Sequence, residues 1–135
     1  MEKSRILVVE DNAIIAKDLQ WQLEDLGYNV PFIAPTGSDA IRRVKENKID
    51  LVLMDIMLEG EMDGIETADE MRTKHSVPVV YLTAYADDET LKRARRTEPY
   101  GYLLKPVSNI EMRSAIEMAI YKHNMERKLR ESEEK

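Results

Sequence analysis

Five short runs of apolar residues recur along the chain, and none of them alternates apolar with polar positions. They are rich in Val, Ile and Leu, which is typical of strands that are buried on both faces of a parallel sheet. The predicted strands cover residues 6–9, 30–34, 51–54, 79–82 and 102–104.

The segments between these runs repeat apolar residues at every third or fourth position, which predicts helices. These helices cover residues 13–26, 37–48, 64–75 and 88–96, and a fifth begins at residue 108. Gly27 is expected to end the first helix, because glycine readily takes the backbone conformation that terminates helices. Ser108 and Glu111 have the spacing of a capping box at the start of the last helix.

A strand is followed by a helix five times, and the connections are long enough for parallel crossovers. This alternation predicts an α/β protein with a flavodoxin-like, three-layer α/β/α fold and a five-stranded parallel sheet in the order 2-1-3-4-5. Pro31 lies inside the second predicted strand and lacks a backbone donor, so that strand belongs at a sheet edge. The order 2-1-3-4-5 places it there.

We expect residues 1–121 to form one domain, and residues 122–135 to be a helical extension or a linker toward a further domain. The last fourteen residues contain five basic residues, four glutamates and no Gly or Pro. This composition favours a final helix that continues past the domain, and a frayed, solvated tail remains the alternative.

Met118, Tyr121, Met125 and Leu129 form a second apolar stripe on this helix, rotated away from its core-facing side. Their spacing of three, four and four residues is close to a heptad, so a weak homodimer through the last helix is one interpretation. The other interpretation is a solvated helix whose apolar groups merely cover the domain surface.

Composition narrows the classes of function. The 135 residues are 43% hydrophobic and 34% charged, as in an ordinary globular domain. No apolar run is long enough to span a membrane, and the N-terminus lacks the pattern of a signal peptide. The sequence also has no cysteine, so we expect a cytoplasmic location. The net charge of −6 argues against direct nucleic-acid binding, and two distant histidines, His75 and His123, argue against a zinc site.

Polar groups follow the apolar strands, at the edge where the carboxyl ends of a parallel sheet meet. Glu10 and Asp11 follow the first strand, Asp55 the third, Thr83 the fourth and Lys105 the fifth. Three carboxylates brought together repel one another unless a cation intervenes, and oxygen ligands of this kind suit Mg²⁺. A metal ion together with Lys105 would supply the positive charge that Asp55 needs inside the apolar run LVLMDIML.

Taken singly, each of these residues has a plainer explanation. An acidic residue or a threonine at the end of a strand often caps the following helix, and a lysine is usually a surface residue. Only the joint pattern, in which each group ends its own strand, favours a magnesium site.

Five stretches of the sequence resemble the receiver domain of two-component response regulators. They are VVEDN (8–12), LMDIML (53–58), MDGIE (62–66), YLTAYAD (81–87) and GYLLKPV (101–107). The resemblance extends over residues 5–121. It implies a phosphorelay module that accepts a phosphoryl group from a sensor histidine kinase or a histidine phosphotransfer protein.

The resemblance also implies roles in phosphorylation. Asp55 would be the phosphoacceptor, and Lys105 and Thr83 would contact the phosphoryl group. Tyr102 matches the aromatic position that turns inward when Thr83 moves, so these two residues would form the switch. A receiver of this kind catalyses only its own phosphorylation and dephosphorylation, so by itself it is not a conventional enzyme.

A bound Mg²⁺ is implied in the same way. Asp11 and Asp55 would be direct ligands, and Glu10 would act largely through water. The backbone carbonyl of Met57 would complete the ligands that the protein supplies.

The tail MERKLRESEEK resembles the helical linker that precedes a PAS sensor domain in multidomain sensory histidine kinases. The implied parent protein would then carry a PAS or kinase domain after this receiver, and the parent chain would itself be an enzyme.

The sequence departs from the common family pattern after Asp55. The loop IMLEGEMDG is one residue longer and lacks the usual proline four residues after the aspartate. Met57 and Tyr85 match the positions that tune dephosphorylation, and neither side chain activates water as a carboxylate or an amide does. We expect a phosphoryl group that persists longer than in fast chemotaxis-type receivers.

Three other functions compete with this interpretation. A Mg²⁺-dependent phosphohydrolase with an aspartyl nucleophile would usually have a second carboxylate where Met57 stands, and would need a cap over its substrate. A flavin- or nucleotide-binding module would have Ser, Thr or Gly after the first strand, where Glu10 and Asp11 would repel phosphate. A pseudo-receiver that only binds partners is disfavoured, because all five site residues are present.

Overall fold

The computed structural model describes residues 3–84 and 87–133, whose strands form one five-stranded parallel sheet. The strands are β1 (Arg5–Val9), β2 (Asn29–Ala34), β3 (Leu51–Asp55), β4 (Val79–Thr83) and β5 (Gly101–Leu104). Their order is β2-β1-β3-β4-β5, and each neighbouring pair is parallel. The predicted flavodoxin-like fold and strand order are therefore confirmed.

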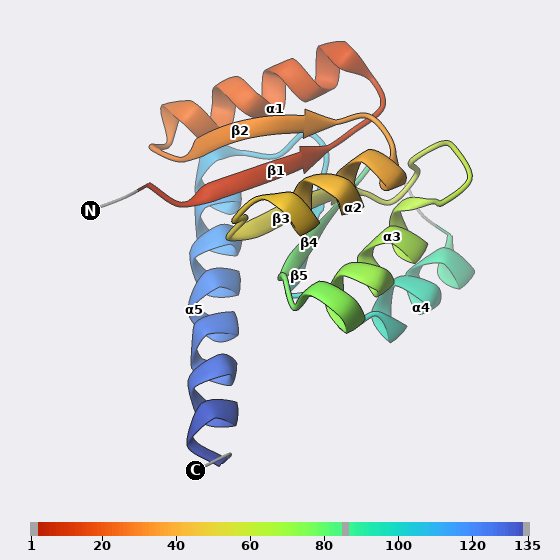
Figure 1. Ribbon diagram of the computed structural model, residues 1–135. Coiled ribbons are helices and arrows are strands. Elements are labelled where there is room, and N and C mark those ends of the chain that lie inside the picture. Colours follow the sequence, from red (N-terminus) through yellow and green to blue (C-terminus); the bar gives the residue numbers. More distant parts are fainter. Residues whose placement is uncertain (1–2, 85–86, 134–135) are drawn as a thin grey trace.

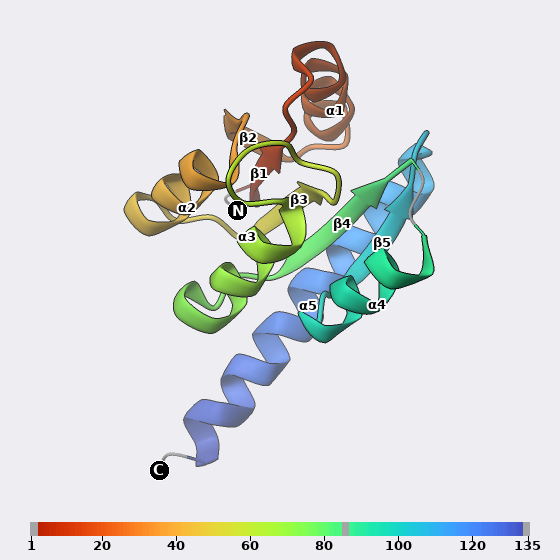
Figure 2. The same cartoon turned by 90° about the vertical axis from the view of Figure 1, so that its right-hand side faces the viewer.

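Five helices cover the two faces of the sheet. They are α1 (Ala13–Asp25), α2 (Gly37–Glu46), α3 (Gly64–Glu70), α4 (Asp88–Arg96) and α5 (Asn109–Glu133). α1 and α5 pack on one face, and α2, α3 and α4 pack on the other (Figure 1 and Figure 2). Each face has its own hydrophobic core, because successive side chains of a strand point to opposite sides of the sheet.

Side-chain caps fix where the helices begin. The Oδ1 atom of Asn12 accepts the backbone N–H groups of Ile14 and Ile15, at 3.0 and 3.1 Å, and starts α1. Before α5, the N–H of Glu111 donates to the Ser108 hydroxyl at 3.1 Å, and the N–H of Ser108 donates to the Glu111 carboxylate at 3.4 Å. This pair is the predicted capping box.

The chain enters β2 through Gly27, whose φ of 99° lies in the region that glycine adopts without strain. β2 forms an edge of the sheet, as the position of Pro31 predicts. The pairing of β1 with β2 shifts between Arg5 and Leu7, opposite the segment that contains Pro31. This irregular pairing accommodates Pro31, which has no backbone N–H to donate to the neighbouring strand.

The predicted helix over residues 64–75 changes its geometry half-way. α3 ends at Glu70, and a π-helix, η1 (Met71–His75), follows it. The Thr73 hydroxyl donates to the backbone carbonyl of Asp69 at 2.9 Å, and hydroxyl bonds of this kind compete with the helical ones.

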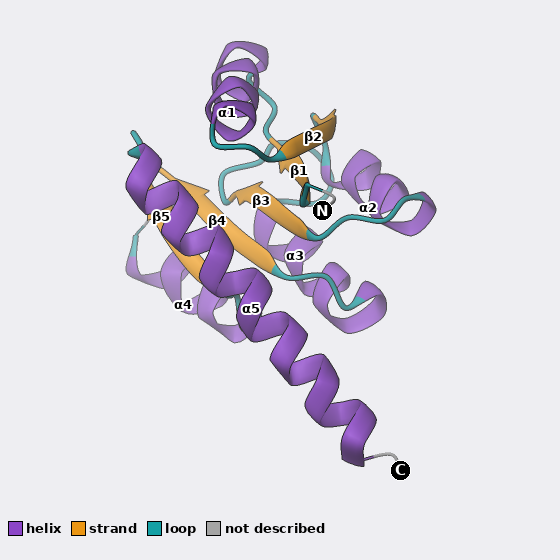
Figure 3. Cartoon of the chain, turned by 90° about the vertical axis from the view of Figure 1, so that its left-hand side faces the viewer, coloured by secondary structure: helices purple, strands orange, loops and turns teal. Residues whose placement is uncertain are grey.

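The last helix runs without interruption from Asn109 to Glu133, and its second half projects past the sheet (Figure 1 and Figure 3). The predicted continuation of this helix beyond the domain is confirmed for the residues that the structure describes. Over the same residues, no helix combines the length and the apolar character that crossing a bilayer requires.

Candidate functional site

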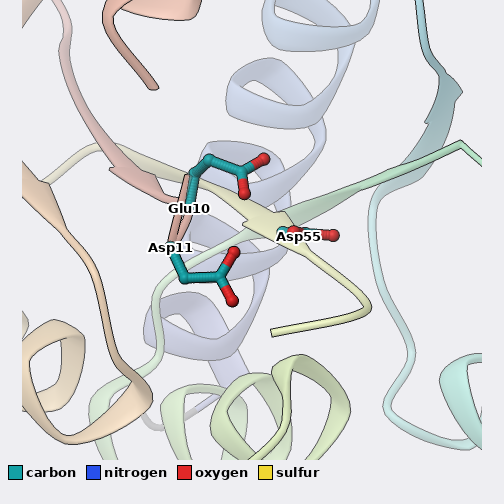
Figure 4. A group of neighbouring side chains, drawn as sticks. All are labelled: Glu10, Asp11 and Asp55. Carbon is teal, nitrogen blue, oxygen red and sulfur yellow. The ribbon is translucent and has the colours of Figure 1, made fainter. Parts of the chain in front are cut away.

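Three carboxylates converge at the carboxyl end of the sheet, from two neighbouring strands. Glu10 and Asp11 directly follow β1, and Asp55 is the last residue of β3, whose Met54 pairs with Val9 of β1. One oxygen of each carboxylate lies within 4.8 Å of the other two. Figure 4 shows the three side chains pointing into a common space.

The three side chains differ in their exposure. Glu10 and Asp55 are buried, at 3% and 6% exposure, whereas Asp11 is exposed. An ion or a small molecule from solvent can therefore reach the cluster on the side of Asp11, whereas Asp55 lies deeper. The prediction that strand ends bring these groups together is confirmed by the geometry.

Backbone amides hold each carboxylate in place. The N–H of Met57 donates to Oδ1 of Asp55 at 3.0 Å. The N–H of Asn12 donates to Oε2 of Glu10, and the N–H of Glu59 donates to Oδ2 of Asp11, both at 3.2 Å. The last of these bonds ties the loop after β1 to the loop after β3, so the acidic cluster is part of one hydrogen-bonded rim.

Gly64 supports the backbone of Asp55, and this role was not anticipated from the sequence. A Cβ atom at position 64 would lie 2.0 Å from the Asp55 carbonyl oxygen, so only glycine lets α3 begin so close to the strand end. The preceding residue, Asp63, caps α3 in a capping box with Glu66. Gly64 stands in the motif MDGIE, which was the available signal.

Lys105 reaches the cluster from the loop after β5. Its Nζ atom lies 2.8 Å from Oε1 of Glu10 and 3.9 Å from Oδ2 of Asp55. Its backbone N–H donates to the carbonyl of Thr83 at 2.9 Å, and its bond to Pro106 is cis. One ammonium group thus lies within 4.0 Å of two of the three carboxylates, and Lys105 with the three acidic side chains has a formal charge of −2.

These donors fit a hard divalent cation. Carboxylate oxygens with excess negative charge are the ligands that Mg²⁺ prefers. Adjacent ligands of one octahedral Mg²⁺ stand about 3 Å apart and opposite ligands about 4.2 Å apart. The carboxylate oxygens lie within 4.8 Å of one another, so adjustments of up to about 2 Å, or a water between the ion and one carboxylate, would let them share an ion. Met57 has its side chain on the surface, at 62% exposure, and its backbone lies beside Asp55.

Thr83 lies on β4, which neighbours β3, and Tyr102 lies on β5, the edge strand beside β4. Thr83 ends β4 and is buried at 3% exposure, and it pairs with Leu104 of β5. Tyr102 is 41% exposed, and its ring centroid lies 5.9 Å from that of Tyr81. Because residues two apart on a strand share a face, Tyr102 lies on the same face as the partner of Thr83. Tyr85, the other predicted flanking position, lies outside the described residues.

The fold and the acidic pocket together define a receiver-type signalling domain. The family model of the response regulator receiver domain matches residues 6–117, and the chain belongs to this family. Receiver domains act in two-component signalling, where they interact with histidine kinases or phosphotransfer proteins, and they bind Mg²⁺ at an acidic pocket.

Known proteins resemble the chain in sequence and in structure. It is 37% identical to the transcriptional regulatory protein PdtaR of Mycobacterium tuberculosis (strain ATCC 25618 / H37Rv) over 116 residues, which are 86% of this chain and 56% of PdtaR. The receiver domain of a modulated diguanylate cyclase from Desulfovibrio desulfuricans G20 superimposes with a TM-score of 0.89 at 40% identity, covering 93% of this chain and 99% of that one.

A second solved structure is the N-terminal domain of a response regulator/sensory box/GGDEF 3-domain protein from Carboxydothermus hydrogenoformans. It matches with a TM-score of 0.83 at 35% identity and covers 91% of this chain and 98% of that one. The chain spans only about half of PdtaR, so these likenesses concern the receiver portion of larger proteins.

Proposed function

We propose that Asp55 accepts a phosphoryl group from the phosphohistidine of a sensor histidine kinase or a histidine phosphotransfer protein. The observation that carries this proposal is the position of Asp55. It is a buried carboxylate at a strand end, with two further carboxylates and an ammonium group within reach. A carboxylate in this setting is an oxygen nucleophile that remains close to solvent and to the incoming donor.

Oδ2 of Asp55 is the proposed nucleophile. Oδ1 is held by the N–H of Met57, whereas Oδ2 faces Nζ of Lys105 at 3.9 Å. Attack of Oδ2 on phosphorus forms a P–O bond while the P–N bond to the histidine breaks, and the imidazole leaves with the bonding electron pair. The products are an aspartyl phosphate and an unphosphorylated histidine.

The surrounding residues would lower the activation free energy of this transfer, because they position the reacting groups and neutralise negative charge. Bound Mg²⁺, held by Asp11, Asp55, Glu10 and the Met57 carbonyl, would neutralise charge on the phosphoryl oxygens. Lys105 would move the short distance from Glu10 toward a phosphoryl oxygen on Asp55.

The proposed switch uses Thr83 and Tyr102. An aspartyl phosphate adds negative charge and strong acceptor oxygens beside the end of β4, and the Thr83 hydroxyl would donate to one of them. Movement of Thr83 would open space on the sheet face that it shares with Tyr102. The half-exposed ring of Tyr102 would then turn inward and change the surface that a partner meets.

The wider context is proposed on the same basis. Residues 1–121 would be the receiver, and residues 122–135 a linker toward a PAS or kinase domain in a cytoplasmic signalling protein. The Carboxydothermus relative, described as a three-domain protein with a sensory box, supports this arrangement. Direct nucleic-acid binding by this segment is not proposed, in line with its net charge of −6.

A labelling experiment tests the acceptor. The chain is incubated with acetyl phosphate and Mg²⁺, and intact-protein mass spectrometry measures the addition of one phosphoryl group. We expect Asp55→Ala to abolish labelling, whereas Asp18→Ala, at an exposed aspartate of α1, labels like the parent chain. Undiminished labelling of the Asp55→Ala protein would remove the assignment. A hydrolytic enzyme would instead release phosphate continuously, without a stable labelled species.

A further inference from the structure

A cavity of about 420 Å³ lies at the end of the sheet opposite to the acidic pocket, and we refer to it as the α5 cavity. Its walls are η1 with the loop before β4, the turn between α4 and β5, and the second half of α5, which projects past the sheet (Figure 3). Small-molecule sites have volumes of roughly 300–1,000 Å³, so the cavity has room for more than a single ion. Val77, Pro99 and the ring of Tyr100 supply the apolar part of its lining.

Two cationic side chains of α5, Lys122 and Arg130, line the α5 cavity. The guanidinium group of Arg130 donates to the Ser76 hydroxyl at 3.4 Å, and the ammonium group of Lys122 lies 5.7 Å from the centroid of the Tyr100 ring. Among residues 3–84 and 87–133, no carboxylate oxygen lies within 4.0 Å of either cationic group. Guanidinium and ammonium groups bind phosphate oxygens strongly, so an anion in the cavity would gain both as partners.

The two carboxylates that line the α5 cavity already have partners. Glu126 accepts a hydrogen bond from the Tyr100 hydroxyl, and Oε2 of Glu98 lies 3.5 Å from Nη1 of Arg72. Arg72 also lines the cavity and is its third cationic residue. Three cationic and two anionic side chains give the lining a formal charge of +1, in a chain whose net charge is −6. The cavity is therefore a local region of positive charge that attracts anions.

His123 responds to this positive charge. It lines the cavity, and its pKa is lowered by burial and by the guanidinium groups of Arg127 and Arg130, while Glu126 has the opposite effect. The imidazole is therefore neutral at pH 7 and adds no charge to the lining. An anion bound beside it would stabilise the protonated imidazole and raise this pKa. The pKa of His123 is thus a measurable indicator of an anion in the cavity.

Both loops that meet α5 at the cavity contain a residue in the left-handed backbone region. Ser76 directly follows η1 and Glu98 lies two residues after α4, and each has a φ of 51°. Glycine commonly occupies such positions after a helix end, because it has no Cβ atom. Here a hydroxyl and a carboxylate remain on the cavity wall despite the backbone strain, and strained residues of this kind concentrate at binding sites.

We propose that the α5 cavity binds a small organic phosphate, namely a phosphate monoester with an apolar organic group. The phosphate would lie against Lys122 and Arg130, and the organic group against Val77 and Pro99. A phosphate monoester carries a charge of about −1.5 to −2 at pH 7, which the two cationic groups of α5 balance. Inorganic phosphate leaves the apolar part of the cavity unfilled and therefore binds less tightly. The proposal does not depend on phosphorylation of Asp55, because the cavity lies at the other end of the sheet.

Isothermal titration calorimetry with phenyl phosphate tests the site. The titration is made without Mg²⁺, so that the excess negative charge of the acidic pocket repels the probe. We expect one phenyl phosphate per chain, and about tenfold weaker binding after Arg130→Gln or Lys122→Gln. Lys128→Gln removes the same charge from an exposed position of α5 and should leave the Kd within about twofold. Inorganic phosphate should bind about tenfold more weakly than phenyl phosphate.

Proton NMR of His123 provides an independent readout. Phenyl phosphate should raise the pKa of His123 in the parent chain, and at the same concentration it should cause no rise in the Arg130→Gln chain. The ligand would contact both α5 and the loops beside it. Hydrogen exchange of the amides in residues 122–133 should therefore slow when phenyl phosphate is present.

Four results overturn the proposal. The first is the absence of saturable binding at millimolar phenyl phosphate. The second is equal weakening by Arg130→Gln and Lys128→Gln, which would mean that the probe responds to the overall charge of α5. The third is equal affinity for phenyl phosphate and inorganic phosphate, which would exclude an organic ligand. The fourth is a changed Kd in the Asp55→Ala chain, which would place the probe in the acidic pocket.

Discussion

Lys105 donates to Glu10 rather than to Asp55: its Nζ lies 2.8 Å from Oε1 of Glu10 and 3.9 Å from Oδ2 of Asp55. Lys105, from the loop after β5, thus donates its hydrogen bond to a carboxylate of the candidate metal site. A divalent ion and this ammonium group repel each other while they share the same negative charges. This relationship leads to a prediction about metal affinity.

Replacing Lys105 with Ala should tighten Mg²⁺ binding while labelling of Asp55 remains possible. Loss of about 1.4 kcal/mol of repulsion corresponds to a tenfold lower Kd. Isothermal titration calorimetry measures the Kd, with Lys17→Ala on the exposed side of α1 as the control. Weaker Mg²⁺ binding in the Lys105→Ala chain would mean that the lysine organises the carboxylates instead of competing with the ion.

Replacing Gly64 with Ala should destabilise the domain. The new methyl group would lie 2.0 Å from the Asp55 carbonyl oxygen, so α3 has to move away from the strand end. Overpacking of this kind costs about 1–3 kcal/mol. Urea unfolding measures the change, and Gly101→Ala serves as the control because its Cβ would meet nothing closer than 3.9 Å. Similar unfolding midpoints for the two variants would contradict the predicted clash.

Stability should fall at high pH because of Tyr81. Burial raises the pKa of Tyr81 from 10.0 to about 12, and its hydroxyl is 2.6 Å from that of Thr97. The unfolded chain therefore loses this proton first. The contribution of Tyr81 is complete below pH 10 and is lost as the pH rises toward 12, by about 1.4 kcal/mol per pH unit at most.

The measurement for Tyr81 is the free energy of unfolding of the parent chain and of Tyr81→Phe at pH 8, 10 and 11.5. Other tyrosines titrate in both chains, so only the difference between the two curves is informative. We expect the parent chain to lose more stability than Tyr81→Phe above pH 10. Tyr121→Phe, at an exposed position of α5, should behave like the parent chain. Parallel curves for the parent chain and Tyr81→Phe would rule out this role.

Replacing Tyr100 with Phe should loosen the projecting part of α5. The change removes the hydroxyl that bonds to Glu126 and lies beside His123. A net loss of about 1 kcal/mol corresponds to roughly fivefold faster local opening. Hydrogen exchange of the amides in residues 122–133 measures this opening, and Tyr121→Phe is the matched control on the same helix. Unchanged exchange would show that the helix is stable without its contact to the turn.

Placing an amide beside the acceptor should shorten the life of the phosphorylated form. Met57 follows Asp55 by two residues, and its exposed thioether does not orient water for attack. We expect the parent chain to retain its phosphoryl group for much longer than seconds after acetyl phosphate is removed. Met57→Asn should shorten this half-life several-fold, whereas Met118→Asn should not. Mass spectrometry over time measures both, and loss of phosphate from the parent chain within seconds would contradict the expectation.

The sequence predicted the fold and the acidic cluster because both follow from local rules. A short apolar run that ends in Asp55 favours a buried strand with a polar end, and parallel strands bring such ends together. Pro31 identified the edge strand, and Ser108 with Glu111 marked the start of α5. These inferences needed only short sequence patterns and the order in which they follow one another along the chain.

The features that were missed depend on approach between distant segments. The closeness of Gly64 to the Asp55 backbone is a property of how a loop folds back, and the contact of Tyr100 with Glu126 joins residues far apart in the chain. The π-helical turn after Glu70 could not be read from a periodicity that spans residues 64–75 evenly.

Because α5 is one unbroken helix, a small tilt at its first residue displaces its last residue by a much larger distance. A helix of 25 residues is about 37 Å long, and it starts four residues after Lys105, at the acidic pocket, and ends beyond the opposite pole of the sheet. A tilt of about 5° at Asn109 would displace Glu133 by about 3 Å, since the displacement grows with helix length. A tilt of that size in response to a change at the acidic pocket would move the far end of α5 by about the length of a hydrogen bond.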